Sequence, residues 1–204
     1  VYARYNTNLS RVNYGDLNLW RDILAHVRDW QICASLDGTG ATGEYIRTGL
    51  DYSAWCRNFE QGLTWCRHPR QMRIDFTLTL PGLLEVKAIQ QLADNYHVDV
   101  LAKVVFAFTP DIILSPLALP RPLLEQKCQQ LRGVTRGALH DVLSHLVERS
   151  TFQEQWPDRW QSALVKGKRR ILRLEQLRGD TYGIDHILKQ DPEIYDWWKN
   201  IRSD

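Results

Sequence analysis

The chain has 204 residues and a mass of 23.8 kDa, the size of one average domain or of one domain with an appendage. Hydrophobic residues make up 44% and charged residues 25% of the sequence, and these globular values exclude a disordered or fibrous chain. The net charge is only +2, so we expect neither nucleic acid nor a membrane surface as a partner. No apolar run reaches the roughly 18 residues of a membrane helix, and no export leader opens the chain, which predicts a cytoplasmic protein.

The cysteines predict free thiols rather than a metal site. Cys33, Cys56, Cys66 and Cys128 are too far apart in sequence to form a C-x-x-C knuckle. Without a secretory leader the compartment is expected to be reducing, so we also expect no disulfide. We therefore assign no metal ligand to this chain.

Strand and helix periods alternate through the first half of the sequence. In chain order, strands are expected at residues 3–8, 31–36, 72–80 and 100–108, and helices at 17–30, 51–67 and 83–96. Asp16 is expected to cap the first of these helices. This alternation is typical of an α/β fold with a parallel sheet, so we expect the four strands to be parallel and adjacent in chain order. Ligand-binding residues should then lie at the carboxyl ends of the strands.

The second half has a helical period. A proline-rich stretch, Pro110 to Pro122, ends the α/β part, so we divide the chain into a first domain at 1–120 and a helical extension at 121–204. Asp191-Pro192 predicts the start of a last helix. Five basic residues stand within eight positions, namely Lys166, Lys168, Arg169, Arg170 and Arg173. We interpret this run as a solvated helix face rather than as a nucleic-acid footprint.

A glycine-rich segment after the second strand is the densest functional signal. Gly38, Gly40 and Gly43 satisfy the G-x-G-x-x-G pattern of dinucleotide-binding sites. That fold also needs a second strand that ends in an acidic residue about twenty positions later, and Glu60 falls within an expected helix instead. A nucleotide-binding α/β domain therefore stays a weaker alternative, beside a glycine-rich turn that binds no ligand.

Three motifs carry a resemblance to a known family. They are Arg4-Tyr5-Asn6-Thr7-Asn8-Leu9, Ser35-Leu36-Asp37-Gly38 and Glu44-Tyr45-Ile46-Arg47. In this order they resemble the latter half of a radical S-adenosylmethionine (radical SAM) enzyme, closest to the twitch-domain proteins related to the SPASM maturases. The resemblance returns near the end, at Leu177-Arg178-Gly179-Asp180 and Asp191-Pro192-Glu193-Ile194. It implies strands three to six of a partial (β/α)6 barrel, a partial TIM barrel with parallel strands, followed by a helical C-terminal extension.

The residue chemistry agrees with an S-adenosylmethionine site. A carboxylate suits the forked guanidinium of Arg47 and the hydroxyl of Ser35. Ribose hydroxyls suit a polar residue at a strand end, such as Asp37 or Asn8. Adenine suits apolar walls with backbone polar groups, which the segment beginning at Val105 offers.

Two plainer interpretations stay open for these residues. Arg47 could form a surface ion pair with Asp51, and Asp37 could simply form the turn before Gly38. The broader rival is a non-catalytic binding or interaction module on a degenerate barrel.

The resemblance also defines what this chain lacks. The C-x-x-x-C-x-x-C motif that binds the 4Fe-4S cluster is absent, so we expect this chain alone to be inactive. In the complete protein the cluster would cleave S-adenosylmethionine reductively, and the 5′-deoxyadenosyl radical would abstract hydrogen from a peptide or a small molecule. Strands one and two are expected before Val1, and their absence would leave an open sheet edge near residues 3–8 that invites self-association.

Overall fold

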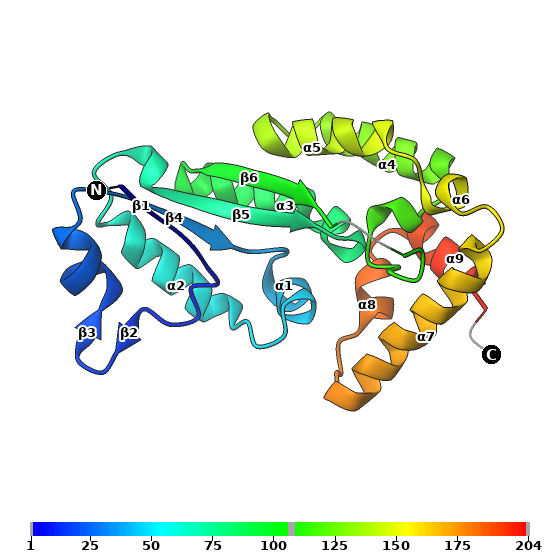
Figure 1. Cartoon of the computed structure of the whole chain (residues 1–204), viewed down its shortest axis with the longest axis horizontal. Coiled ribbons are helices and arrows are strands. Elements are labelled where there is room, and N and C mark those ends of the chain that lie inside the picture. The colour runs from blue at the N-terminus through cyan, green and yellow to red at the C-terminus, as the bar shows by residue number, and fades with distance from the viewer. Residues whose placement is uncertain (1, 106–108, 203–204) are drawn as a thin grey trace.

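The structure is a computed structural model that describes residues 2–105 and 109–202 (Figure 1). Four strands form one sheet in the order β1-β4-β5-β6, and each neighbouring pair is parallel. These strands are β1 (Tyr2–Thr7), β4 (Asp29–Ser35), β5 (Met72–Leu78) and β6 (Asp99–Val104). The expectation of four parallel strands adjacent in chain order is confirmed. Residues 106–108, expected to end the last strand, lie outside the described residues.

The two faces of the sheet differ because side chains alternate along each strand. On β5, Met72 and Phe76 are buried on one face, against Gly62 of α2 (Tyr52–Leu63) and Gly82 of α3 (Leu80–Tyr96) respectively. The other face is polar, and there Lys103 Nζ donates to both carboxylate oxygens of Asp75 at 2.8 Å. The apolar side chains that build the core therefore lie between the sheet and its helices.

The two edges of the sheet are also different. Figure 1 shows α5 (Gly137–Glu148) lying along β6, with α4 (Arg121–Arg132) packed beside it. The outer edge of β1 pairs with no other strand among the described residues. Tyr2 and Tyr5 of β1 are 56% and 48% exposed. Within the part of the chain that the structure describes, β1 is thus the open edge.

The region between β1 and β4 corrects the expectation of a helix at 17–30. A small hairpin, β2 (Asn13–Tyr14) and β3 (Leu17–Asn18), is followed by a π-helix (Leu19–Ile23) and a 3-10 helix (Leu24–His26). Asp16 lies in the hairpin turn, and the cap is Asn18, whose Oδ1 accepts from Trp20 N and Arg21 N. This cap starts the short π-helix at Leu19, while Leu17 and Asn18 pair in the hairpin. Trp20 and Leu24 are fully buried. The spacing of the apolar residues therefore indicated which side chains are buried, and it did not indicate a continuous helix.

Five further helices complete the described part of the chain, and of these the sequence predicted only the start of the last one. They are α1 (Gly40–Ile46), α6 (Phe152–Gln155), α7 (Trp160–Arg178), α8 (Ile184–Leu188) and α9 (Pro192–Asn200), with 3-10 turns at Pro69–Gln71 and Pro116–Ala118. The predicted start of the last helix is confirmed, because Asp191 Oδ1 accepts from the backbone N–H groups of Glu193 and Ile194. Of the helices in residues 2–105 and 109–202, none has both the length and the apolarity that crossing a membrane requires.

Candidate functional site

Asp37 stands two residues after the end of β4, at the carboxyl edge of the sheet. Its Oδ1 accepts from Thr77 N at 2.8 Å, and its Oδ2 accepts from Arg47 Nη1 at 2.7 Å. The residue is 7% exposed. Asp37 therefore joins the end of β4 to the end of β5 and holds Arg47 in place.

Arg47 caps the carboxyl end of α1 and borders a cavity of about 390 Å³. We call this cavity the carboxyl-edge cleft, and it is lined by Asn8, Ser10, Asp37, Ile46, Arg47, Thr48, Gly49 and Leu50. Gly49 has a φ of +86°, a conformation that favours glycine, and it turns the chain back after α1. The Arg47 side chain keeps 29% exposure although it pairs with Asp37. Its remaining guanidinium N–H groups can therefore reach a ligand.

Asn8 approaches the carboxyl-edge cleft from the end of β1. Its Oδ1 accepts from both the backbone N and the Oγ of Ser10, at 3.2 Å and 2.9 Å. These bonds fix the orientation of the side chain and leave its amide nitrogen, a donor, without a partner among the described residues. The cleft thus combines two donors, on Asn8 and Arg47, with one buried carboxylate.

Three of the five residues predicted from the sequence meet in this cleft, and two do not. Asn8, Asp37 and Arg47 line it. Ser35 is the last residue of β4 and lies opposite Asp75 of β5. Val105 extends the ladder of β6 through its N–H, which donates to Leu78 O at 3.0 Å.

The plainer interpretations of Arg47 and Asp37 are wrong in part. Arg47 pairs with Asp37 rather than with Asp51, and Asp51 caps α2 by accepting from Ala54 N at 2.7 Å. Asp37 does stand before the glycine turn, but both of its oxygens are bonded outside that turn.

The glycine segment is closer to a nucleotide-binding loop than its sequence context indicated. α1 begins at Gly40, inside the motif, and a Cβ on Gly43 would lie 2.2 Å from Gly38 O. Where a phosphate would bind, however, Glu85 Oε2 accepts from Thr39 N at 2.8 Å and from Thr39 Oγ1 at 2.6 Å. A carboxylate at that position repels a second anion. In addition, α1 is followed by another helix, α2, instead of a strand.

The helical part of the chain holds α1 in place through a contact that the sequence did not indicate. Tyr45 Oη donates to Glu175 Oε1 at 2.7 Å, and the Arg178 guanidinium stands 5.3 Å from the centre of the Tyr45 ring. Arg178 also donates to Thr48 Oγ1 at 2.7 Å. Burial, together with the bond to Glu175, raises the pKa of Tyr45 well above its ordinary value. α7 therefore positions the loop that carries Arg47.

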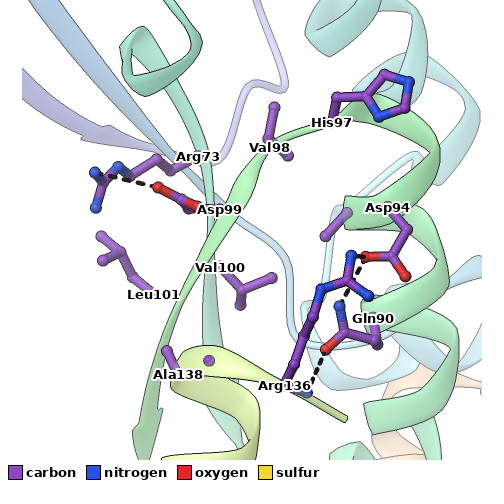
Figure 2. Close-up of a pocket in the computed structure, with 12 residues that line it drawn as sticks. Arg73, Gln90, Asp94, His97, Val98, Asp99, Val100, Leu101, Arg136 and Ala138 are labelled. Carbon is purple, nitrogen blue, oxygen red and sulfur yellow. Dashed lines mark hydrogen bonds and ion pairs between the residues drawn. The ribbon is translucent and has the colours of Figure 1, made fainter. Parts of the chain in front are cut away.

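A second and larger cavity lies at the opposite end of the strands (Figure 2). It has a volume of about 580 Å³ and is bordered by the amino ends of β5 and β6, the end of α3 and the start of α5. Its charged side chains are paired with each other, Arg73 with Asp99 at 3.4 Å and Arg136 with Asp94. Because these pairs neutralise the lining, we do not assign the function to this cavity.

The described residues do not fit an iron–sulfur cluster. The four cysteines are free and stand on different elements, and no group of three His, Cys, Asp or Glu side chains is arranged to hold a metal ion in residues 2–105 and 109–202. Burial raises the pKa of Cys66 and of Cys128 to about 11. Cluster ligation requires thiolates, which such values disfavour.

No family model, curated protein or solved structure matches this chain. The function is therefore inferred from the geometry of its own residues.

Proposed function

We propose that this chain is the S-adenosylmethionine-binding part of a radical SAM enzyme and that the carboxyl-edge cleft holds the methionyl end of the ligand. The observation that carries the proposal is the Asp37–Arg47 pair, which borders a cleft of about 390 Å³ at the carboxyl edge of a parallel sheet. A cleft of this size is within the usual range for small-molecule sites, and the edge is where parallel sheets bind ligands.

The roles follow from the donors and acceptors in the cleft. The free N–H groups of Arg47 and the amide nitrogen of Asn8 donate to the ligand carboxylate. Asp37 keeps acceptor capacity for the ligand ammonium, since each carboxylate oxygen has two lone pairs. Val105, at the end of β6, lies two strand spacings from β4, which is about 10 Å. The adenine end of an extended ligand reaches Val105 only by crossing the end of β5, where Thr77 N bonds to Asp37.

The cluster of a radical SAM enzyme supplies the electron that cleaves S-adenosylmethionine. Its ligands would have to come from outside these 204 residues, because the described residues do not fit it. We therefore expect this chain to bind S-adenosylmethionine without cleaving it.

The free cysteines support a reducing, cytoplasmic compartment. The open edge of β1 is where we expect a further strand or a second copy to pair.

Isothermal titration of S-adenosylmethionine into the 204-residue chain tests this proposal. We expect one ligand per chain and a loss of about 10- to 150-fold in affinity for Arg47→Ala, the cost of about 1.5–3 kcal/mol for a hydrogen bond to a charged group. Arg47→Lys should lose less affinity than Arg47→Ala, because lysine keeps the positive charge but cannot bind the carboxylate through two guanidinium N–H groups. Arg21→Ala, which removes an exposed ion pair outside the cleft, is the control and should leave the affinity unchanged.

Binding of separate components of S-adenosylmethionine shows which part of the ligand occupies the cleft. Methionine alone should compete with S-adenosylmethionine for the cleft, and Asn8→Asp should weaken both, because a second carboxylate repels that of the ligand. A folded wild-type chain that binds no S-adenosylmethionine would overturn the proposal.

A further inference from the structure

One side of α7 carries a row of exposed cations. Lys166, Arg169, Arg170 and Arg173 stand at positions i, i+3, i+4 and i+7, so they share one stripe of a helix with 3.6 residues per turn. All four are exposed, while the opposite side of α7 is buried through Ala163, Leu164, Gly167 and Ile171. We call these four residues the basic face. Figure 1 shows α7 running along the outside of the helical part of the chain.

The structure separates the fifth cation of this run from the other four. Lys168 is 7% exposed, and its Nζ donates to the carbonyl oxygens of Trp198 and Ile201 at 2.9 Å each. Lys168 therefore caps the carboxyl end of α9, and we assign it a structural role. Within the described residues, no hydrogen bond joins the side chains of the basic face to the rest of the fold.

The charges of the basic face are compensated only in part. Among residues 2–105 and 109–202, no acidic side chain forms a salt bridge with any of the four cations. Asp111 is close enough for its pKa to be lowered, first by a hydrogen bond from Thr109 and then also by the charges of Lys166 and Arg170. Asp111 thus lies near Lys166 and Arg170 and offsets part of their charge.

This arrangement is unfavourable for an isolated helix. Lys166 and Arg170, like Arg169 and Arg173, are like charges at i,i+4, and such pairs destabilise a helix. A helix face with no role beyond solvation more often alternates the sign of its charges. The row of like charges therefore indicates a negatively charged partner.

We propose that the basic face of α7 binds the phosphate backbone of a nucleic-acid duplex. Three of its four cations are arginines, whose planar fork binds phosphate oxygens in pairs. The exposed positions that continue the stripe are Ser162, Gln176 and Leu177, so no aromatic side chain is there to stack on bases, as single-strand binding requires. A membrane surface fits less well, because most of the apolar side of α7 is buried in the fold, and the exposed Leu174 and Leu177 offer little apolar area to insert.

The net charge of +2 led to the opposite expectation, since 24 acidic residues almost cancel 26 basic ones over the whole chain. Phosphate contacts depend on where the cations lie rather than on their sum. The basic face concentrates four of them within about 10 Å of helix length.

Fluorescence anisotropy with a labelled RNA duplex, and with the DNA duplex of the same sequence, tests this proposal on the 204-residue chain. We expect binding that does not depend on base sequence. A plot of log Kd against log salt concentration, between about 50 and 200 mM, should have a slope of about 3 to 4, as four phosphate contacts predict. Arg169→Gln should reduce that slope by about 1.

A charge-matched pair of variants separates the basic face from net charge. Arg169→Glu/Arg173→Glu should weaken binding of the duplex by tenfold or more and leave S-adenosylmethionine binding unchanged. Arg28→Glu/Arg57→Glu changes the net charge equally at exposed positions away from α7 and should leave Kd within about twofold, as expected for charges that contact no phosphate.

Four results would overturn the proposal. They are no binding of either duplex by the folded chain, equal losses in the two double variants, no loss in Arg169→Glu/Arg173→Glu, and displacement of the duplex by polyglutamate as readily as by unlabelled duplex. The last result would assign the basic face to an acidic protein instead.

Discussion

Asp37 and Arg47 stand ten residues apart in the chain, and their side chains meet in an ion pair of 2.7 Å at the carboxyl edge of the sheet. The same carboxylate accepts from Thr77 N, so one side chain connects β4, β5 and the loop after α1. The pair is partly shielded from water, because Asp37 is almost fully buried. Ion pairs in such positions contribute more than those on the surface.

Asp37→Asn tests the structural part of this pair. The amide keeps an oxygen for Thr77 N and loses the charge that holds Arg47, so the free energy of unfolding should fall by about 1.5–3 kcal/mol. Asp99→Asn, which breaks a pair with Arg73 whose carboxylate side is 65% exposed, is the control and should cost about 0–1 kcal/mol. Urea denaturation measures both. Equal losses in the two variants would show that the Asp37–Arg47 pair is no stronger than a surface pair.

Tyr45→Phe tests whether α7 positions the cleft. Removing the hydroxyl breaks the bond to Glu175 and should cost about 0.5–1.5 kcal/mol of stability. It should also weaken S-adenosylmethionine binding, because the loop after α1 loses its support. Tyr96→Phe is the control, since its hydroxyl donates to Glu60 at 2.9 Å outside the cleft. Tyr96→Phe should lose stability and keep its affinity, and an equal loss of affinity in both variants would contradict this role of α7.

Acid should loosen the contact between α4 and α6. The Arg121 guanidinium, followed by the backbone N–H of Thr151, lowers the pKa of Glu154 from 4.5 to about 2. A carboxyl whose pKa is lowered by folding contributes stability above pH 4.5 and loses that contribution as the pH falls to about 2. The urea midpoint should therefore fall across this range, and less so in Glu154→Gln. An unchanged pH dependence in Glu154→Gln would assign the acid sensitivity to other carboxyls, such as Asp22.

Arg169→Glu should stabilise the chain while it weakens duplex binding. The new carboxylate stands four residues before Arg173 and three after Lys166, so two like-charge pairs become attractive, by about 0.2–0.5 kcal/mol each. Thermal unfolding measures the gain, and Arg169→Gln should give a smaller one. A loss of stability in Arg169→Glu would mean that Arg169 has a structural role.

Some parts of this structure follow from local patterns, and others cannot. The alternation from Met72 to Leu78 identified a strand because a two-residue period is a property of consecutive residues. Asn8 and Asp37 were expected to meet because neighbouring parallel strands end at one edge. The spacing of Trp20 and Leu24 predicted a long helix wrongly, because it shows only that both side chains are buried. The backbone there forms a short helix that begins after Asn18, whose Oδ1 accepts from Trp20 N and Arg21 N.

Contacts between segments that are distant in the sequence could not be predicted, because they produce no local sequence pattern. Tyr45 and Glu175 are 130 residues apart, and neither residue type indicates the other. The second cavity combines side chains from β5, β6, α3 and α5, which only the tertiary packing brings together. The basic run of α7 was visible, but its division into buried Lys168 and four exposed cations depended on which side of the helix packs.

Nuclear magnetic resonance of the arginine Nε–Hε groups tests the central claim most directly, since it observes Arg47 itself during titration with S-adenosylmethionine. The Arg47 signal is assigned by its loss in Arg47→Lys, and Arg121, paired with Glu154 outside the cleft, is the internal control. We predict that the ligand shifts the Arg47 signal and leaves that of Arg121 in place. An unchanged Arg47 signal in a chain saturated with S-adenosylmethionine would contradict the assignment of the carboxyl-edge cleft.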